Sequence, residues 1–176
     1  LDEEPEEIER GLTLTPQVYT FNHLDHEFTF IDTPGYNKFL ADTRFCLRAS
    51  DAAVLVLSAT SNIKDLARDS WSAINEFELP RFIFLNMMDK DHFNEALHAI
   101  EKGCNILPVC LTVPMGAEHH LSGVIDLLNM KALKFAADKS GKVQEMEIPA
   151  EFVDEAKAQR EKLIEAIVET DEKLMS

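Results

Sequence analysis

The sequence predicts an α/β fold, a doubly wound and mostly parallel sheet that is followed by a smaller α+β subdomain. Up to Pro114, short apolar runs alternate with amphipathic stretches at helical spacing. The run AAVLVL at 52–57 is continuously apolar, which is typical of a parallel strand covered on both faces. Because this alternation stops after Pro114, we expect one domain at 1–114 and a second at 115–176.

The expected elements follow from periodicity and from turn residues. Residues 17–22 and 27–32 alternate between apolar and polar side chains, and the polar LDH between them predicts a hairpin turn. The rest of this domain is expected to alternate helices and strands. They are a helix at 37–49, a strand at 52–57, a helix at 63–77, a strand at 82–86, a helix at 91–101 that Gly103 ends, and a strand at 106–113. The subdomain is expected to hold a mixed element at 123–135, a strand at 143–148 and an amphipathic helix at 150–175.

Composition excludes several classes of protein. The chain carries 32 Asp and Glu against 17 Lys and Arg, a net charge of −15, which argues against a general polyanion-binding surface and against DNA. No run approaches about 18 consecutive apolar residues, so no membrane-spanning helix is expected. The three cysteines form no C-x-x-C motif and are expected to be reduced thiols, as in a cytoplasmic protein.

Three short motifs fall at the boundaries of expected strands, where ligands bind in α/β folds. They are RGLT at 10–13, DTPG at 32–35 and NMMD at 86–89. A Thr hydroxyl and an Asp carboxylate are oxygen ligands that suit Mg²⁺. A glycine lets its backbone N–H approach a terminal phosphate. A carboxylate like that of Asp89 can accept two hydrogen bonds from a guanine edge, and adenine would leave it poorly paired.

With these motifs the chain resembles the translational GTPases, most closely elongation factor G. The stretch EEIERGLTLT is similar to that family's first switch, DTPG to its second, and NMMD to its guanine motif. The segments PVCLTVPMGAEHHLSGVIDLLNMKALKF and EIPAEFVDEAKAQREKLIEAIVETDEKLM resemble the subdomain inserted in elongation factor G. The resemblance implies a fold like that of the P-loop NTPases, GTP or GDP and Mg²⁺ as ligands, and a ribosomal partner, both rRNA and ribosomal proteins.

The resemblance also implies a role for each matching residue. Thr13 would ligate Mg²⁺ in the GTP state, and Asp32 would support the shell of that ion. Gly35 would sense the γ-phosphate, while Asn86 and Asp89 would hold and recognise guanine.

The chain departs from the family pattern in three places. Tyr36 stands where the family has a catalytic His directly after DTPG. Met87 replaces a Lys whose stem packs over the base, so only the apolar contact is retained. No G-x-x-x-x-G-K-[ST] motif occurs, since among the six glycines only Gly141 precedes a Lys and Val143 follows it. We therefore expect an internal piece of a larger factor, running from the first switch into the insertion.

Three hypotheses remain open at this stage. The first is part of a translation factor that hydrolyses GTP on the ribosome. The second is a nucleotide-dependent switch that hydrolyses slowly or not at all and acts as a ribosome-binding module, which Tyr36 supports. The third is an independent acidic interaction module without phosphate chemistry, which the missing P-loop would support. Separately, the acidic helix at 150–175 is expected to be either a solvated face or a partner-docking surface. The pair His119–His120 lacks further residues at metal-ligand spacing and is expected to be a solvated loop.

Overall fold

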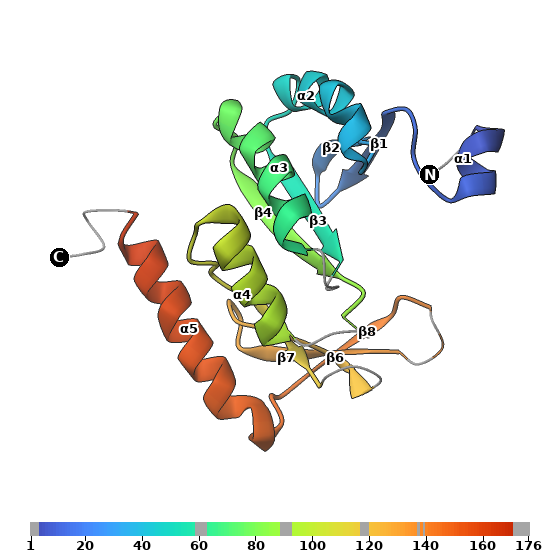
Figure 1. Ribbon diagram of the computed structural model, residues 1–176. Coiled ribbons are helices and arrows are strands. Elements are labelled where there is room, and N and C mark those ends of the chain that lie inside the picture. The colour runs from blue at the N-terminus through green and yellow to red at the C-terminus, as the bar shows by residue number, and fades with distance from the viewer. Residues whose placement is uncertain are drawn as a thin grey trace. The chain divides into compact units, whose positions relative to one another are not determined.

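The computed structural model describes residues 4–58, 63–88, 93–116, 120–136, 138 and 140–170 (Figure 1). They fall into two compact units. The first contains the chain up to Leu57 together with Asp65–Phe84, and the second contains Ser58–Lys64 and the chain from Leu85 onward. The parallel pair of strands in the first unit and the antiparallel strands of the second confirm the α/β class with additional antiparallel structure. The boundary that we expect at 114 stays a prediction.

The first unit begins with a short helix and a β-hairpin. Helix α1 spans Pro5–Arg10, and strands β1 (Gln17–His23) and β2 (His26–Asp32) pair antiparallel. Leu24 and Asp25 between them both have positive φ, 47° and 62°. That combination is the two-residue turn whose twist matches a hairpin. Both strands were predicted, and the observed turn is one residue shorter than expected.

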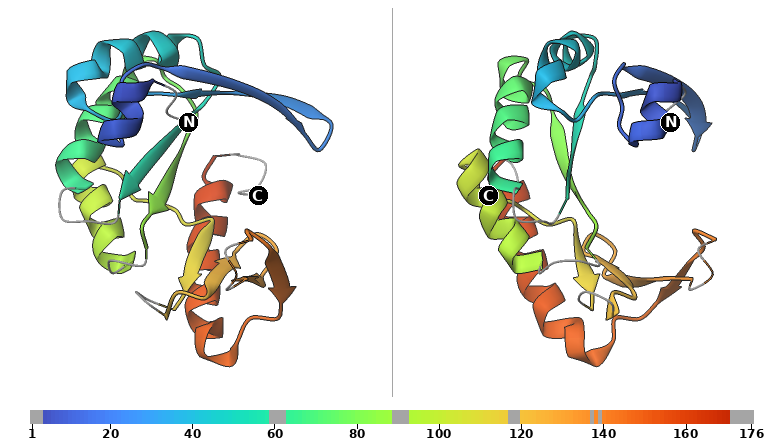
Figure 2. Two further views of the ribbon diagram at one scale, coloured as in Figure 1. Left: turned by 90° about the vertical axis from the view of Figure 1, so that its right-hand side faces the viewer. Right: turned by 45° about the vertical axis from the view of Figure 1, so that its right-hand side comes forward.

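A helical segment and a βαβ unit follow the hairpin. The elements are η1 (Asn37–Phe39), α2 (Leu40–Arg48), β3 (Ala53–Ser58), α3 (Ile63–Glu76) and β4 (Arg81–Asn86). Strands β3 and β4 run in the same direction in one sheet, and α3 lies along one face of it (Figures 1 and 2). Hydrophobic side chains of β3 point alternately inward and outward, so the sheet has one buried face.

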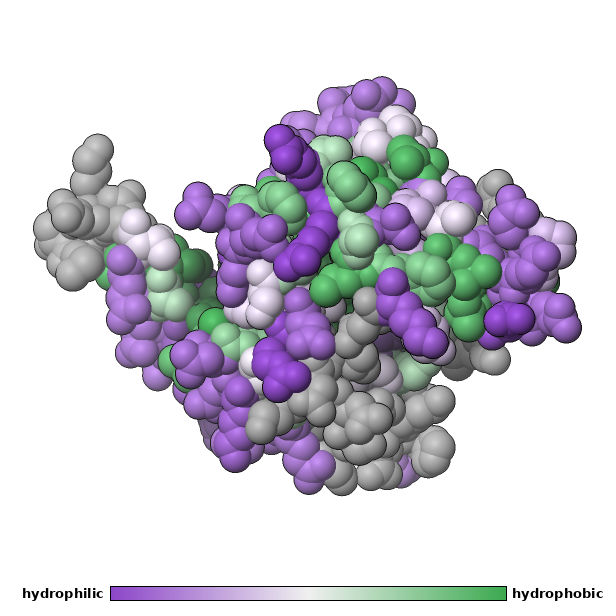
Figure 3. All heavy atoms as spheres, turned by 45° about the horizontal axis from the view of Figure 1, so that its top comes forward, coloured by the Kyte–Doolittle hydropathy of each residue, from purple (hydrophilic) through white to green (hydrophobic). Residues whose placement is uncertain are grey.

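The prediction that residues 52–57 would be covered on both faces is wrong for this chain. Ala53, Leu55 and Leu57 are buried, whereas Val54 and Val56 are 60% and 58% exposed. The outward residues of β4 behave alike: Phe82 is 58% and Phe84 57% exposed. Val54, Val56, Phe82 and Phe84 form what we call the open face. Among the residues that the structure describes, no element covers it. Figure 3 shows that hydrophobic residues reach the surface elsewhere as well.

The second unit builds an antiparallel sheet with helices. Its elements are α4 (Phe93–Cys104), β5 (Thr112–Met115), β6 (Gly123–Asp126), β7 (Lys131–Phe135), β8 (Val143–Met146), η3 (Ala150–Phe152) and α5 (Val153–Val168). The sheet has the order β5-β6-β7-β8, all antiparallel. Its buried cluster, here called the insertion core, consists of Val113, Met115, Ile125, Leu127, Ala132, Ala156 and Leu163.

Two expectations for the start of the second unit, the end of its first helix and the strand that follows, are wrong. Helix α4 continues through Gly103 to Cys104, and Asn105 then takes the left-handed conformation with φ 54°. Asn is the residue that replaces Gly in this role most readily. The strand expected at 106–113 is confined to β5, which pairs with β6 rather than extending a parallel sheet. The register with β6, in which Thr112 lies opposite Asp126, sets where β5 begins. In the described ranges, no helix combines the length and apolarity that a membrane span requires.

Candidate nucleotide-binding site

The loop that carries Thr13 is built on Glu7. Pro5 occupies the first turn of α1, and Glu4 and Glu7 form a capping box at its start. The helix ends at Gly11, whose φ of 61° is left-handed and whose N–H donates to the carbonyl of Glu7. The side chain of Glu7 is fully buried, although it ends in a carboxyl group.

The carboxylate of Glu7 accepts hydrogen bonds from the loop that follows the helix. Its Oε1 accepts from the backbone N–H of Leu14 at 2.8 Å and of Thr15 at 3.1 Å. The Thr15 hydroxyl donates to the same oxygen at 3.3 Å. Thr13, the expected metal ligand, directly precedes two residues that are held to this side chain, and it is itself half-buried.

The DTPG motif begins at the last residue of β2. Asp32 lies opposite Gln17 in the hairpin, so the Thr13 loop and DTPG both leave the same end of it. Pro34 is buried, whereas Gly35 is exposed, and a Cβ placed on Gly35 would meet no atom within 4 Å. The backbone at Gly35 is accordingly open to an approaching group, as a phosphate contact requires.

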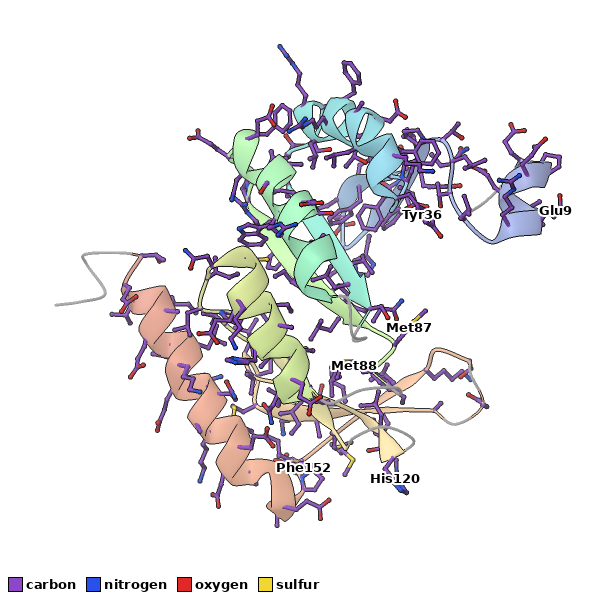
Figure 4. All side chains as sticks on the ribbon, viewed as in Figure 1. Glu9, Tyr36, Met87, Met88, His120 and Phe152 are labelled. Atoms are coloured by element: carbon purple, nitrogen blue, oxygen red, sulfur yellow. The ribbon has the colours of Figure 1, made fainter. Side chains whose placement is uncertain are left out.

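Tyr36 follows at the start of the next helical segment. Its carbonyl accepts the N–H of Phe39 at 2.9 Å, which begins η1. The side chain is 58% exposed and lies beside the hairpin in Figure 4. A tyrosine hydroxyl is uncharged at neutral pH, so it can orient water but is a poor proton acceptor.

The guanine motif follows β4 in the second unit. The side-chain oxygen of Asn86 accepts the N–H of Met87 at 2.9 Å, and Met87 has a left-handed backbone with φ 57°. The Ser58 hydroxyl at the end of β3 donates to the Met87 sulfur at 3.3 Å. Figure 4 shows Met87 and Met88 where the chain leaves β4. Asp89 lies outside the described residues.

The structure thus places the predicted residues in two groups. Thr13, Asp32, Gly35 and Tyr36 belong to the first unit, and Asn86 and Met87 to the second. The oxygen ligands of the first group, a hydroxyl and a carboxylate, suit Mg²⁺. No sequence signal indicated Glu7, because Glu4 is not the Ser or Thr that the sequence signature of a capping box requires. No sequence signal indicated Ser58.

Other metal or thiol chemistry has no support in the described part of the chain. The search of those residues gives no group of three or more His, Cys, Asp or Glu that could hold a metal ion. Cys46, Cys104 and Cys110 are free, and burial raises the pKa of each thiol above its ordinary value. A raised pKa keeps a thiol protonated and unreactive at neutral pH. His119 lies outside the described residues.

A family model described as the elongation factor Tu GTP binding domain matches residues 1–171. The chain belongs to this family. It is therefore a GTP-binding domain of the translational GTPase type, and the resemblance seen in the sequence is confirmed.

One solved structure is similar over nearly the whole chain. It is a protein from Thermus thermophilus, with a TM-score of 0.87 and 26% sequence identity. The match covers 99% of this chain but only 26% of the Thermus chain. The chain thus spans about a quarter of the length of that relative.

Proposed function

We propose that the chain is part of an elongation factor G-like protein that binds GTP with Mg²⁺ and hydrolyses it on the ribosome in the cytoplasm. The observation that carries this proposal is that two motifs lie at the same end of one hairpin. The Thr13 loop and DTPG leave the same end of the β1–β2 hairpin, one with a hydroxyl and the other with a carboxylate. The family match supports the guanine nucleotide as the ligand.

Each site residue has a role in this proposal. Thr13 and Asp32 hold the ion, directly or through its waters. The Gly35 backbone N–H donates to the γ-phosphate, and the open space at Gly35 supports that approach. Asn86 and Asp89 hold and recognise guanine, and Met87 supplies an apolar contact to the base. The bound Mg²⁺ neutralises phosphate charge and so lowers the barrier to phosphoryl transfer.

The proposal places the remaining phosphate contacts on residues outside this sequence. The G-x-x-x-x-G-K-[ST] motif is absent from the chain, and the Thermus relative is about four times as long. Within the described ranges, β1–β2 and β3–β4 form two separate sheets, which leaves edges of both unpaired. Unpaired edges and an open apolar face are costly unless another segment pairs with them and covers them. We propose that the antiparallel subdomain contacts the ribosome, because the resemblance to elongation factor G implies such a contact.

A second candidate is a switch that binds GTP but hydrolyses it slowly. The observation that favours it is Tyr36, an exposed side chain at the position of the family's catalytic His. The test is single-turnover hydrolysis on ribosomes by the longer protein and its Tyr36→His variant. A slow switch predicts faster hydrolysis with His, by about 10²- to 10⁴-fold. An unchanged or lower rate would mean that Tyr36 serves catalysis adequately and would remove this candidate.

Nucleotide titration tests the main proposal. In isothermal titration calorimetry with Mg²⁺, the longer protein should bind GTP in preference to ATP, and the isolated 176-residue chain should bind GTP weakly or not at all. Asp89→Asn should weaken GTP by about 1.5–3 kcal/mol, because a doubly accepting carboxylate is lost. The same variant should favour xanthosine triphosphate. Equal affinity of the longer protein for GTP and ATP would contradict the proposal.

A further inference from the structure

Glu7 is the one charged residue that is fully buried among those the structure describes. A carboxylate removed from water is costly unless hydrogen-bond donors replace the lost hydration. Here backbone N–H groups supply them, and hydrogen bonds to an ionised acceptor are about twice as strong as neutral ones. The sequence around Glu7 is rich in acids, and Glu6 and Glu9 on the same helix are exposed, so burial is specific to this position.

Glu7 holds both ends of the segment that contains Thr13. On the near side its backbone carbonyl accepts the N–H of Gly11 and, at 3.2 Å, that of Leu12. On the far side its Oε1 accepts the N–H of Leu14 at 2.8 Å and of Thr15 at 3.1 Å. Oε2 also accepts the N–H of Glu4 at 3.3 Å, which fixes the carboxylate against the start of the helix.

These contacts fix the backbone on each side of Thr13, and those to Leu14 and Thr15 depend on the side chain of Glu7. A loop that is already ordered costs less conformational entropy when a ligand engages it. This lower entropy cost strengthens the binding of a ligand that Thr13 contacts and leaves the binding of other ligands unchanged. In the proposed function the hydroxyl of Thr13 would hold Mg²⁺ together with the triphosphate, so the ordered loop would favour the triphosphate over the diphosphate.

We propose that Glu7 is a positioning residue that holds Thr13 ready for Mg²⁺ and the γ-phosphate, and thereby sets the preference for a nucleoside triphosphate over the diphosphate. The inference rests on the proposed function. It adds a residue that acts through the Thr13 loop and does not touch the nucleotide.

The test measures two dissociation constants in the longer protein with Mg²⁺. The ligands are GDP and the non-hydrolysable analogue guanosine 5′-(β,γ-imido)triphosphate. Glu7→Ala should weaken the triphosphate analogue by about 10- to 100-fold, because charge-assisted hydrogen bonds that order the loop are lost. Affinity for GDP should stay within about twofold, since Thr13 does not contact it. Glu7→Gln keeps an acceptor oxygen and should give an intermediate loss.

Glu9→Ala is the matched control. Glu9 lies on the outer side of the same short helix, is exposed, and should change neither constant (Figure 4). The double variant Thr13→Ala/Glu7→Ala separates positioning from general stability. If Glu7 acts through Thr13, adding Glu7→Ala to Thr13→Ala should weaken the triphosphate analogue by less than about twofold further.

Two outcomes overturn the inference while leaving the proposed function intact. One is an equal loss of both nucleotides in Glu7→Ala, and the other is an undiminished effect of Glu7→Ala in the Thr13→Ala background. A wild-type protein that binds neither guanine nucleotide would overturn the proposed function and the inference with it. Should Glu7→Ala fail to fold, Glu7→Gln decides. Amide hydrogen exchange at Leu14 and Thr15 should speed up in that variant, and unchanged exchange would contradict the positioning role.

Discussion

Strands β3 and β4 are more apolar than the strands of the β5–β8 sheet, yet one face of the β3–β4 sheet stays open, whereas the second unit builds the insertion core. Val56 of β3 is 58% exposed on the open face, whereas Leu127, which follows β6, is fully buried in the insertion core. In the second unit, β5, β6 and β7 together with α5 supply the buried side chains from within this chain. In the first unit, the described elements supply cover for one face of the sheet.

The difference teaches that an apolar strand indicates a face to be buried but not the segment that buries it. Apolar surface contributes about 25 cal/mol per Å² only when it leaves water. The open face therefore adds little to the stability of this chain, and most of the free energy from apolar burial should lie on the inner face of β3–β4 and in the insertion core. Substitutions on the two sheets should accordingly have very unequal effects.

The largest expected effect comes from the insertion core. Leu127→Ala should lower the free energy of unfolding by about 2–5 kcal/mol, because it leaves a cavity in packed surroundings. Val56→Thr on the open face should change it by less than about 0.5 kcal/mol. The measurement is urea unfolding of the 176-residue chain, followed by far-ultraviolet circular dichroism.

Tryptophan fluorescence shows which of the two units loses stability. Trp71 is the single tryptophan and lies in α3 of the first unit. Leu127→Ala should thus shift the circular dichroism transition more than the Trp71 transition. A larger loss from Val56→Thr than from Leu127→Ala would break the comparison between the two sheets.

The second effect concerns Arg160, which links α5 to the turn after β6. Its guanidinium donates to the carbonyl oxygens of Leu127 and Leu128, the latter at 2.7 Å. Arg160→Ala should lower the free energy of unfolding by about 1.5–3 kcal/mol, as expected for hydrogen bonds to a charged donor. Lys157→Ala, at an exposed position of the same helix, is the control and should cost less than about 0.5 kcal/mol. Equal losses in both variants would show that the carbonyl contacts contribute no stability.

A smaller effect is expected in the first unit, at Arg81. Its guanidinium lies 4.6 Å from the centre of the Trp71 ring and also donates to the side-chain oxygen of Asn75. Arg81→Met should cost about 0.5–1 kcal/mol at this partly exposed site and should alter the Trp71 emission spectrum. Arg48→Met, an exposed substitution in α2, should leave the emission unchanged. An unaltered spectrum in Arg81→Met would argue against the stacked geometry.

Local patterns predicted the elements well where local physics decides them. Alternation predicted β1 and β2, and helical spacing predicted α3 and α5. The misplaced strand at 106–113 shows the limit of this approach. A run of apolar residues does not reveal its partner, and pairing with β6 sets where β5 begins. Similarly, Gly103 suggested a helix end that tertiary packing moved to Asn105.

The roles of Thr13, Asp32, Gly35 and Asn86 stay predictions, which rest on motifs that follow a fixed order in the sequence. The contacts that support these residues could not be predicted in the same way. Glu7 belongs to an acidic stretch that looks like a solvated surface, and its partners are backbone N–H groups, which no sequence pattern displays. The contact between Ser58 and Met87 joins two strand ends that are distant in sequence, so only the fold reveals it.

The smallest expected effect is a pH dependence in the second unit, at Asp126. Burial raises the pKa of this carboxyl, but hydrogen bonds from Asn129 and Leu128 and the charge of Arg160 together lower it below its ordinary value. Oδ1 accepts the N–H of Leu128 at 2.8 Å, and Oδ2 accepts the Asn129 side-chain amide at 2.7 Å.

A pKa that is lower in the folded state means that the ionised form of Asp126 stabilises the fold. That contribution is complete above the unfolded pKa of about 3.9 and is lost as the pH falls through the folded pKa. Because the turn is open to solvent, we expect less than about 1 kcal/mol. In urea unfolding between pH 7 and pH 2, the difference in free energy between wild type and Asp126→Asn should shrink on acidification. Asp154→Asn in α5 is the exposed control. A difference that stays constant or grows toward pH 2 would show that the hydrogen bonds to Asp126 do not favour its ionised form.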